Sequence, residues 1–373
     1  MILRREVATD RMPGSANDGQ LLAAATIALF LMLGSCSPWA PTQGDTPNGA
    51  ASVHALLASN PYRETEERSV TALPKEARGK LMLFVLAGQS NMSGRGTVVD
   101  RSVVDGIYLF GNDGRWKAAS DPLDSCAGQI DRVSCDPDSG VGPGMEFART
   151  LKQIRPDAHI GLIPCAKGAS TIFEWERRLN PESLYGNCLL RMSAASNQGR
   201  IHAILFLQGE WDALDDSYKH RLLEPIWSLP SKLPGHRVDY SVAVDETERP
   251  TDNGGSNFPK DGTIQLRKDS MVGWNRGLAG YWGQIFADIV DGWRLDLERP
   301  DLPVILAVIG DNKNPKAYVH WQEVQRQQRT LRLPHLFRIE TQGLELRDNV
   351  HFTTSSSVEI GRRFARVYSQ EAH

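Results

Sequence analysis

Four short segments of the sequence contain the side chains that acyl transfer requires. They are spread along the chain, at residues 88–96, 167–170, 208–212 and 348–352. Together they provide a serine hydroxyl, an imidazole, carboxylates, a side-chain amide and small residues whose backbone N–H groups a substrate can approach. An enzyme needs these groups to attack an acyl carbon and to stabilise the negative charge that develops on its oxygen.

Ser90, Asp348 and His351 form the most informative combination. Taken alone, a serine after a strand is more often a helix cap, and a single histidine is more often structural. Asp348 precedes His351 by three residues, and residues at this spacing share one side of a helical turn. The carboxylate can then accept from one ring nitrogen of His351, while the other nitrogen takes the proton of Ser90. We therefore predict Ser90 as the nucleophile, His351 as the base and Asp348 as the group that orients the base.

An oxyanion needs hydrogen-bond donors at the place where its charge develops. The backbone N–H groups of Ser90 and Gly168 are candidates, and the side-chain amide of Gln208 is a third. An amide at the end of a strand can also be a simple cap, and for Gln208 that alternative stays open.

Apolar runs explain how these segments come together. Five continuous apolar runs predict buried strands, over residues 81–87, 107–110, 160–166, 202–207 and 303–309. Helical patterns are predicted over residues 145–154, 181–197, 281–297 and 355–369. The alternation of strand and helix predicts a three-layer α/β/α fold around a five-stranded parallel sheet. Ligands of such sheets bind at the carboxyl ends of the strands, and the chemical groups follow those ends.

Taken together, the segments resemble the SGNH (GDSL-like) hydrolases, and among these the branch of sialate O-acetylesterases and carbohydrate esterase family six. The matching strings occupy residues 87–96, 161–168, 208–213 and 348–354, and residues 174–177 add a similarity to plant carbohydrate esterases. The resemblance implies a flavodoxin-like SGNH fold, ester hydrolysis without a metal or other cofactor, and acetylated xylan or a related glycan as substrate. It also implies Ser90, Asp348 and His351 as the triad. The oxyanion donors that it implies are Ser90, Gly168 and Gln208.

Four residues beside these groups are assigned to substrate contact or to support of the site: Gln89, Asn91, Glu210 and Trp211. Glu210 is a candidate for orienting loops or the histidine rather than for touching substrate. Relatives have a serine where Trp211 lies. A tryptophan at the rim of the cleft can stack on a sugar ring, or it can fill core space, and both interpretations stay open.

The function predicted from these features is O-deacetylation of a carbohydrate through an acyl-enzyme. Two alternatives stay open. One is a lipid or thioester hydrolase on the same fold, which would need an apolar groove. The other is a surface lipoprotein that binds glycan without hydrolysing it. The net charge of −3 shows no basic excess, so nucleic acid is not an expected partner.

The cysteines are typical of an exported protein. Apart from Cys36, the chain has Cys126, Cys135, Cys165 and Cys188, an even number that permits disulfides. Cys126 and Cys135 bracket a polar loop and are the favoured pair. Cys165 ends an apolar strand and is expected to be a buried free thiol. The sequence has no CxxC motif or paired histidines to support zinc.

The N-terminal region predicts export. Basic residues precede an apolar run over residues 21–33, which is shorter than the roughly 20 residues that span a bilayer. The run ends in Leu33-Gly34-Ser35-Cys36, a string that resembles a bacterial lipobox. We interpret residues 1–36 as an export signal and Cys36 as the lipidated residue of a bacterial cell-envelope lipoprotein, with a membrane contact only through that lipid. Plain secretion and an uncleaved anchor are the alternatives.

Composition predicts three further boundaries. Residues 37–75 are rich in Pro, Ala, Thr, Ser and Asn, and they are expected to form a flexible tether. Residues 76–373 are expected to form the esterase domain. Residues 214–277 exceed what a crossover between strands needs, so they are interpreted as an insertion to which the family resemblance does not extend.

Overall fold

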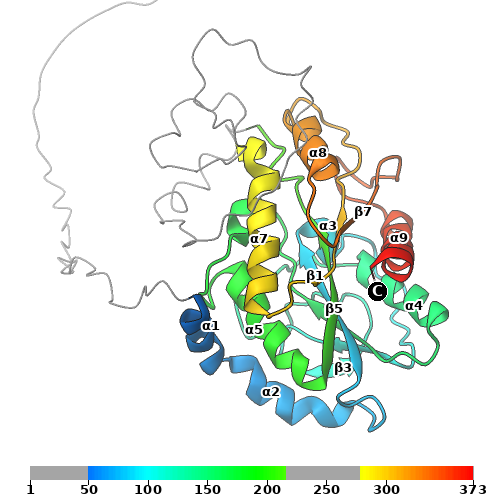
Figure 1. The fold of residues 1–373 in the computed structure, drawn as a ribbon. Coiled ribbons are helices and arrows are strands. Elements are labelled where there is room, and N and C mark those ends of the chain that lie inside the picture. The colour runs from blue at the N-terminus through cyan, green and yellow to red at the C-terminus, as the bar shows by residue number, and fades with distance from the viewer. Residues whose placement is uncertain (1–48, 216–277, 373) are drawn as a thin grey trace, which may run out of the picture. The chain divides into compact units, whose positions relative to one another are not determined.

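The structure is a computed structural model that describes residues 49–215 and 278–372. The chain divides into two units, Met1–Gly44 and Asp45–His373, and all described residues belong to the second. They form one sheet with helices on both faces (Figure 1). The predicted export signal with Cys36, and all but the first two residues of the predicted insertion, lie outside the described residues.

The sheet contains seven strands among the described residues, in the order β3-β2-β4-β1-β5-β6-β7. They are β1 (Leu81–Gly88), β2 (Ile107–Phe110), β3 (Trp116–Ala118), β4 (Ile160–Pro164), β5 (Gly199–Leu207), β6 (Val304–Ala307) and β7 (Leu336–Ile339). Strands β2 and β3 pair antiparallel, and every other neighbouring pair is parallel. The run β4-β1-β5-β6-β7 follows the 2-1-3-4-5 order of flavodoxin-like sheets. The predicted α/β/α fold and all five predicted strands are confirmed, but the sheet has seven strands and not five, and one of them is antiparallel.

The sequence does not predict β3 and β7, the strands at the two edges of the sheet. Arg338 lies within β7, and Lys117 and Ala118 of β3 are exposed. An edge strand pairs on one side only and is less buried than a central strand. Its sequence therefore lacks the continuous apolar run that marks a strand covered on both faces.

Helices α4, α5, α7 and α9 confirm the four predicted helices. The longer helices after β1 are α4 (Pro143–Ile154), α5 (Leu184–Ala195), α7 (Trp282–Asp296), α8 (Trp321–Thr330) and α9 (Thr354–Glu371). The short ones are α3 (Ser90–Ser93) and three 3-10 turns at Ile172–Trp175, Ser196–Gln198 and Leu278–Tyr281. Helix α8 is not predicted, because it is mostly polar. In the part of the chain that is described, no helix has the length and apolar character needed to cross a membrane.

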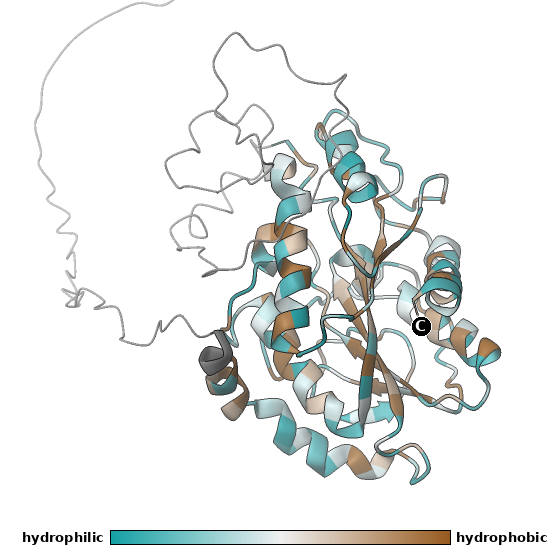
Figure 2. Cartoon of the chain, in the orientation of Figure 1, coloured by the Kyte–Doolittle hydropathy of each residue, from teal (hydrophilic) through white to brown (hydrophobic). Residues whose placement is uncertain are grey.

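Strand β1 shows how the three layers are built. Leu83 and Val85 pack into a core with α5 and α7, whereas Phe84 and Leu86 pack into a second core with α4 and α9. Figure 1 shows these two pairs of helices on opposite sides of the sheet, and Figure 2 shows apolar residues concentrated along the strands. Both faces of the sheet are covered, which is why its central strands consist mostly of apolar residues.

Residues 49–72 correct the expected tether. They form α1 (Gly49–Ala58), α2 (Pro61–Ser69) and a 3-10 turn at Val70–Ala72. Tyr62 is fully buried, and its hydroxyl donates to Asp131 Oδ2 at 2.8 Å. The expectation of a flexible tether over residues 37–75 is therefore wrong from residue 49 on, and the packed domain begins before residue 76. Composition alone misses this because the partner of Tyr62 lies 69 residues away in the sequence.

The structure joins the four described cysteines in two disulfides. Cys126 bonds Cys135, the pair that the sequence favours, with a Cα–Cα distance of 5.2 Å. Cys165 bonds Cys188, with a Cα–Cα distance of 5.5 Å. The expectation of a free thiol at Cys165 is wrong, because α5 packs Cys188 against the end of β4, a long-range contact that no local pattern reveals.

Candidate active site

Ser90 lies at the turn between β1 and α3. Gly88, two residues earlier, has a φ of 134°, and a Cβ added to it would lie 2.1 Å from the carbonyl oxygen of Leu207. Only glycine fits this turn, because it has no side chain to clash and adopts positive φ without strain. The close approach sets the ends of β1 and β5 side by side. In flavodoxin-like sheets these two strands flank the point where the strand order reverses, and ligands bind there.

The structure brings Ser90, His351 and Asp348 together in one hydrogen-bonded chain. His351 Nε2 lies 3.0 Å from Ser90 Oγ, and His351 Nδ1 lies 2.8 Å from Asp348 Oδ2. Asp348 Oδ1 accepts from the backbone N–H groups of His351 at 2.8 Å and Val350 at 3.0 Å. Burial alone would raise the pKa of Asp348, but these hydrogen bonds outweigh it and lower the pKa. The ionised carboxylate can hold Nδ1–H and leave Nε2 free to accept from Ser90.

Asn91 fixes the position of the histidine. Its Oδ1 accepts from the N–H of Phe352 at 3.1 Å, and its Nδ2 donates to the carbonyl of Val350 at 3.0 Å. The side chain therefore bonds the residues on both sides of His351. Nδ2 also donates to Glu210 Oε1 at 2.6 Å. Because Asn91 is 2% exposed and its amide is occupied, it supports the site from behind.

Glu210 lies behind Asn91 and away from solvent. It is buried, and burial raises the pKa of its carboxyl to about 7. Its Oε1 accepts from Asn91, whereas its Oε2 has no hydrogen-bond partner among the described residues. Of the two roles considered for Glu210, the geometry favours support of the histidine loop through Asn91.

The prediction that Gln208 is an oxyanion donor is contradicted by the structure. Its side chain is wholly buried. Nε2 donates to the carbonyl of Ser170 at 2.9 Å and also to Asp212, and Oε1 accepts from Trp282 Nε1 at 2.8 Å. Both amide hydrogens are used inside the protein, so Gln208 connects the ends of the strands instead of facing a substrate. This is the capping role that the sequence left open.

The backbone amides of Ser90 and Gly168 remain as candidate oxyanion donors. The loop of Gly168 lies beside the nucleophile turn, because the N–H of Lys167 donates to the carbonyl of Gly88 at 3.0 Å. Within the described residues, neither the Ser90 nor the Gly168 N–H donates to a backbone acceptor. A tetrahedral oxyanion requires N–H donors that are not already paired inside the protein.

Gln89 and Trp211 lie at the same end of the sheet. Gln89 is buried, and its Oε1 accepts from the N–H groups of Gly209 at 3.2 Å and Trp211 at 3.5 Å. Gln89 therefore ties the nucleophile turn to the end of β5. Trp211 is partly exposed, so part of its surface is open to a ligand and it does not belong to the sealed core.

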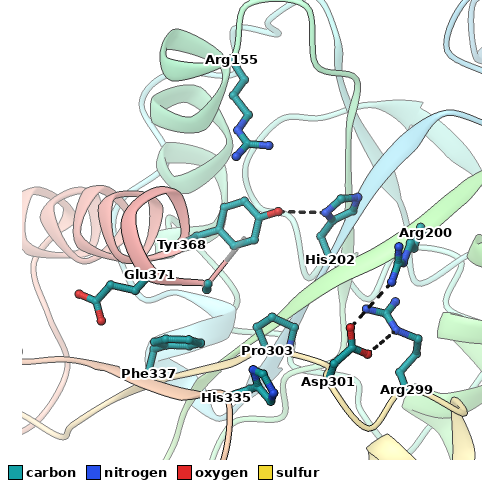
Figure 3. A pocket seen from close by; sticks show the side chains of 11 residues that line it. Arg155, Arg200, His202, Arg299, Asp301, Pro303, His335, Phe337, Tyr368 and Glu371 are labelled. Atoms are coloured by element: carbon teal, nitrogen blue, oxygen red, sulfur yellow. Dashed lines mark hydrogen bonds and ion pairs between the residues drawn. The ribbon is translucent and has the colours of Figure 1, made fainter.

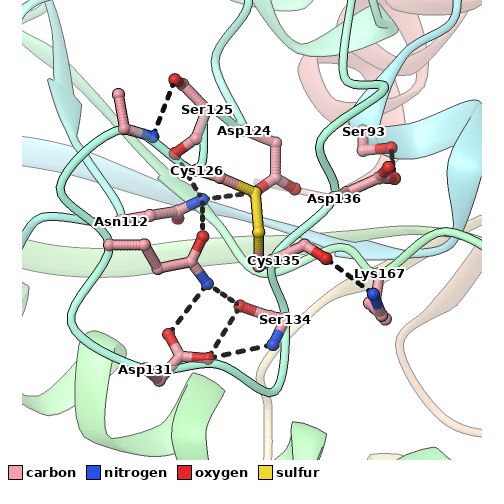
Figure 4. The surroundings of a disulfide bond; sticks show 12 residues. Ser93, Asn112, Asp124, Ser125, Cys126, Asp131, Ser134, Cys135, Asp136 and Lys167 are labelled. Atoms are coloured by element: carbon pink, nitrogen blue, oxygen red, sulfur yellow. Dashed lines mark hydrogen bonds between the residues drawn. A yellow bond between two sulfur atoms is a disulfide. The ribbon is translucent and has the colours of Figure 1, made fainter.

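Three further polar residues join the nucleophile turn, and the sequence does not single them out. Asp136 accepts from Ser93 Oγ at 2.6 Å and from Arg95 Nη2 at 2.9 and 3.0 Å. Ser93 and Arg95 lie within the string that resembles the esterases, which is the only signal for them. Asp136 lies directly after Cys135, in a loop whose place over the turn depends on tertiary structure (Figure 4).

A separate cavity of about 590 Å³ lies at the amino ends of β5, β6 and β7, the edge of the sheet opposite to Ser90 (Figure 3). Its lining includes Arg155, Arg200, His202 and Arg299. Burial, together with the positive charges of these three arginines, lowers the pKa of His202 to about 4. No residue of the predicted triad lines this cavity. Within the described ranges, no group of His, Cys, Asp and Glu side chains has a metal-binding arrangement.

Comparison with known proteins points to carbohydrate esterases. A family model described as carbohydrate esterase, sialic acid-specific acetylesterase, matches residues 80–238 and 274–370. These ranges include all four segments with chemical groups. A curated Arabidopsis thaliana protein named probable carbohydrate esterase is 28% identical over 308 residues, covering 77% of this chain and 89% of the relative.

One solved structure supports the fold, and two others are reported with it. The X-ray structure of an Arabidopsis thaliana protein has a TM-score of 0.55 and 26% identity, and the match covers 79% of this chain and 100% of that one. A carbohydrate acetylesterase from Xanthomonas citri has a TM-score of 0.47 and 16% identity, covering 78% of this chain and 56% of that one. The crystal structure of NanS has a TM-score of 0.47 and 15% identity, covering 79% of this chain and 98% of that one.

Proposed function

Because the chain belongs to the carbohydrate esterase family described as sialic acid-specific acetylesterase, and is thus a carboxylic ester hydrolase, we propose that it removes O-acetyl groups from a carbohydrate with Ser90 as nucleophile. One observation carries the proposal. Ser90 Oγ, His351 and Asp348 form a continuous relay with distances of 3.0 and 2.8 Å. This is the arrangement that activates a serine toward an ester.

The reaction proceeds through an acetyl-enzyme. Ser90 Oγ attacks the ester carbonyl carbon while His351 Nε2 takes its proton, and the N–H groups of Ser90 and Gly168 stabilise the tetrahedral oxyanion. The oxyanion collapses, and the sugar leaves with the proton held by His351. Water then attacks the acetyl-enzyme and gives a proton to His351. That proton returns to Ser90 Oγ as acetate leaves.

The proposed substrate is acetylated xylan or a related acetylated glycan, and no nucleic acid is involved. The description of the family and the name of the Arabidopsis thaliana relative support a carbohydrate. Trp211 supports it too, because it is partly exposed beside the nucleophile turn and an indole ring can stack on a sugar.

Acetate release from acetylated xylan, acetylated pectin and O-acetylated sialic acid tests the proposal. We expect release from at least one of them, and Ser90→Ala and His351→Ala should each lower kcat by at least about 10⁴-fold. Full activity of either variant would refute the triad. Glycan binding without hydrolysis of any activated ester would instead favour a binding protein. A preference for long-chain over acetyl p-nitrophenyl esters, or for thioesters, would favour a lipid or thioester hydrolase.

We also propose that the protein is an exported lipoprotein of a bacterial cell envelope, anchored through Cys36. The two disulfides support export, because such bonds persist in oxidising compartments. In a bacterial host, mass spectrometry of the membrane fraction should find a lipid on Cys36, and Cys36→Ser should release the protein from the membrane. Recovery of the unlipidated wild-type protein from the medium would favour plain secretion.

A further inference from the structure

A buried ion pair lies beneath the nucleophile turn. Arg95 Nη2 donates to both carboxylate oxygens of Asp136, at 3.0 and 2.9 Å. Ser93, in the same short helix as Ser90, donates to Asp136 at 2.6 Å. The side chain of Asp136 is 4% exposed and that of Arg95 is 14% exposed. Arg95 Nη1 also donates to Ser93 Oγ at 3.0 Å and to the carbonyl of Gly94 at 2.9 Å. The guanidinium therefore bonds the nucleophile turn and Asp136 at the same time, and these charge-assisted contacts fix its orientation.

The same ion pair supports the loop that carries the second oxyanion donor. A Cβ added to Gly168 would lie 2.5 Å from Arg95 Nη2 and 2.6 Å from Asp136 Oδ2. The backbone of Gly168 therefore rests directly on the pair. One carboxylate thus lies against both segments that carry the candidate oxyanion donors, those of Ser90 and Gly168.

A disulfide holds this carboxylate in place. Asp136 directly follows Cys135, which is bonded to Cys126. The carbonyl of Cys135 accepts from Lys167 Nζ at 2.6 Å, and Lys167 is the neighbour of Gly168. Figure 4 shows Asp136 and Lys167 on the same side of the disulfide, with Lys167 Nζ directed at the carbonyl of Cys135.

We propose that Asp136 and Arg95 are positioning residues that set the separation of the Ser90 and Gly168 N–H groups, with the Cys126–Cys135 disulfide holding Asp136 against the loop. This inference rests on the proposed esterase function. Oxyanion donors act only at correct distance, and a misplacement of about 1 Å lowers the rate by up to ~10²-fold. Asp136 and Arg95 do not touch substrate and act only through the backbone that they support.

The chain offers a matched control for this ion pair. Asp131 lies in the same disulfide-bonded loop and forms a buried ion pair with Arg191. Asp131 also accepts from Tyr62, and Arg191 donates to Ser134. No contact of Asp131 reaches the nucleophile turn or Gly168 in the described part of the chain. Loss of the Asp131 charge should therefore lower stability without disturbing the oxyanion donors.

The test compares Asp136→Asn with Asp131→Asn. Asparagine keeps the size of aspartate and one acceptor oxygen but removes the charge. For each variant, kcat and KM for p-nitrophenyl acetate are measured well below its own Tm. The inhibition constant of a small alkylboronic acid is measured as well, because its tetrahedral adduct on serine places an oxygen against the oxyanion donors.

We expect Asp136→Asn to lower kcat by about tenfold or more, to change KM by less than about twofold, and to weaken boronic acid inhibition by the same factor as kcat. Asp131→Asn should lower Tm and leave kcat and boronic acid inhibition within about twofold of wild type. A wild-type kcat in Asp136→Asn, or a lower kcat with unchanged boronic acid inhibition, would overturn the inference.

Two further variants cover the case in which Asp136→Asn does not fold. Arg95→Lys keeps the charge but has one terminal nitrogen, so it does not reproduce the separate contacts of Nη2 to Asp136 and of Nη1 to Ser93 and Gly94. The double variant Cys126→Ser with Cys135→Ser releases the loop. Each should show the same parallel loss of kcat and boronic acid affinity, and unchanged values in both would overturn the inference. Ser90→Ala separates the two proposals. If it is inactive while Asp136→Asn is fully active, only the positioning role fails, whereas an active Ser90→Ala refutes the proposed function itself.

Discussion

The side-chain amide of Asn91 donates a 2.6 Å hydrogen bond to the buried carboxyl group of Glu210. Asn91 follows the proposed nucleophile directly and bonds the residues on both sides of His351. Through this pair, the nucleophile turn, the end of β5 and the histidine loop form one network. The relay from Ser90 to Asp348 is thus supported from behind by two buried side chains.

Replacing Asn91 should uncouple the base from the nucleophile. In Asn91→Ala the backbone groups of Val350 and Phe352 lose their partner, so we expect kcat to fall by about 10- to 10²-fold and stability to fall by about 1–3 kcal/mol. Steady-state kinetics and urea unfolding measure both. Asn197→Ala is the control, because Asn197 bonds Glu66 at 3.2 Å, away from the site. A wild-type kcat in Asn91→Ala would contradict this role.

Glu210 should make stability depend on pH. Its pKa is raised from 4.5 to about 7, so the folded state favours the neutral carboxyl. Its contribution to stability is therefore complete below about pH 4.5 and is lost as the pH rises through about 7. Glu210→Gln should remove this loss and be more stable than wild type above pH 7, by at most about 3 kcal/mol.

Unfolding by urea between pH 5 and pH 8 measures this effect. Asp121, Asp124 and Asp288 also have pKa values raised to about 7 by burial, so the wild-type curve contains their contributions. The difference between wild type and Glu210→Gln isolates Glu210. Glu64→Gln, at an exposed helix position, should follow the wild-type curve. Parallel curves for wild type and Glu210→Gln would show that Glu210 is ionised in the folded protein.

Asp348 should be needed for the tautomer of His351. Asp348→Asn preserves shape but presents an amide to Nδ1, which favours the tautomer with the proton on Nε2. That tautomer cannot accept from Ser90, so kcat should fall by about 10⁴-fold with little change in substrate binding. Asp301→Asn, an exposed carboxylate at the opposite edge of the sheet, should retain activity. Equal kcat for Asp348→Asn and wild type would show that Asp348 has no part in the relay.

The turn at Gly88 should tolerate no side chain. In Gly88→Ala the new Cβ would lie 2.1 Å from the carbonyl oxygen of Leu207, so we expect a loss of more than about 4 kcal/mol or no soluble protein. Gly79→Ala is the matched control. Gly79 has a φ of 71° and nothing within 4 Å of the added Cβ, so only backbone strain of about 1–2 kcal/mol applies. Similar unfolding curves for the two variants would contradict the close contact at Gly88.

The Cys165–Cys188 disulfide should stabilise the fold by constraining the unfolded chain. Its two cysteines are 23 residues apart, a spacing for which the chain-entropy model gives about 3 kcal/mol. The double variant Cys165→Ala with Cys188→Ala should lose roughly that amount in urea unfolding. Alkylation of the denatured, unreduced wild-type protein should leave both cysteines unmodified. Modification of Cys165 would contradict the disulfide and show that Cys165 is a free thiol, as the sequence predicts.

The sequence by itself determined the central sheet and the ends at which the chemistry lies. Continuous apolar runs identify the buried strands, because a strand covered on both faces must be apolar at every position. Parallel strands bring their carboxyl ends to one edge, so Ser90, Gly168 and Glu210, each following such a strand, can be placed together from order alone. Asp348 and His351 are three residues apart, so their pairing can also be predicted from the sequence.

Only the tertiary structure decided which partner each polar group takes. The amide of Gln208 is occupied by Ser170, Asp212 and Trp282, Cys165 meets Cys188, and Tyr62 anchors residues expected to be a tether. The ion pair between Asp136 and Arg95 is likewise a contact that only the folded chain creates. These contacts join residues far apart in the chain, and burial then requires each polar group to find a partner. A local pattern indicates that a group can form hydrogen bonds, and the packed fold selects its partner.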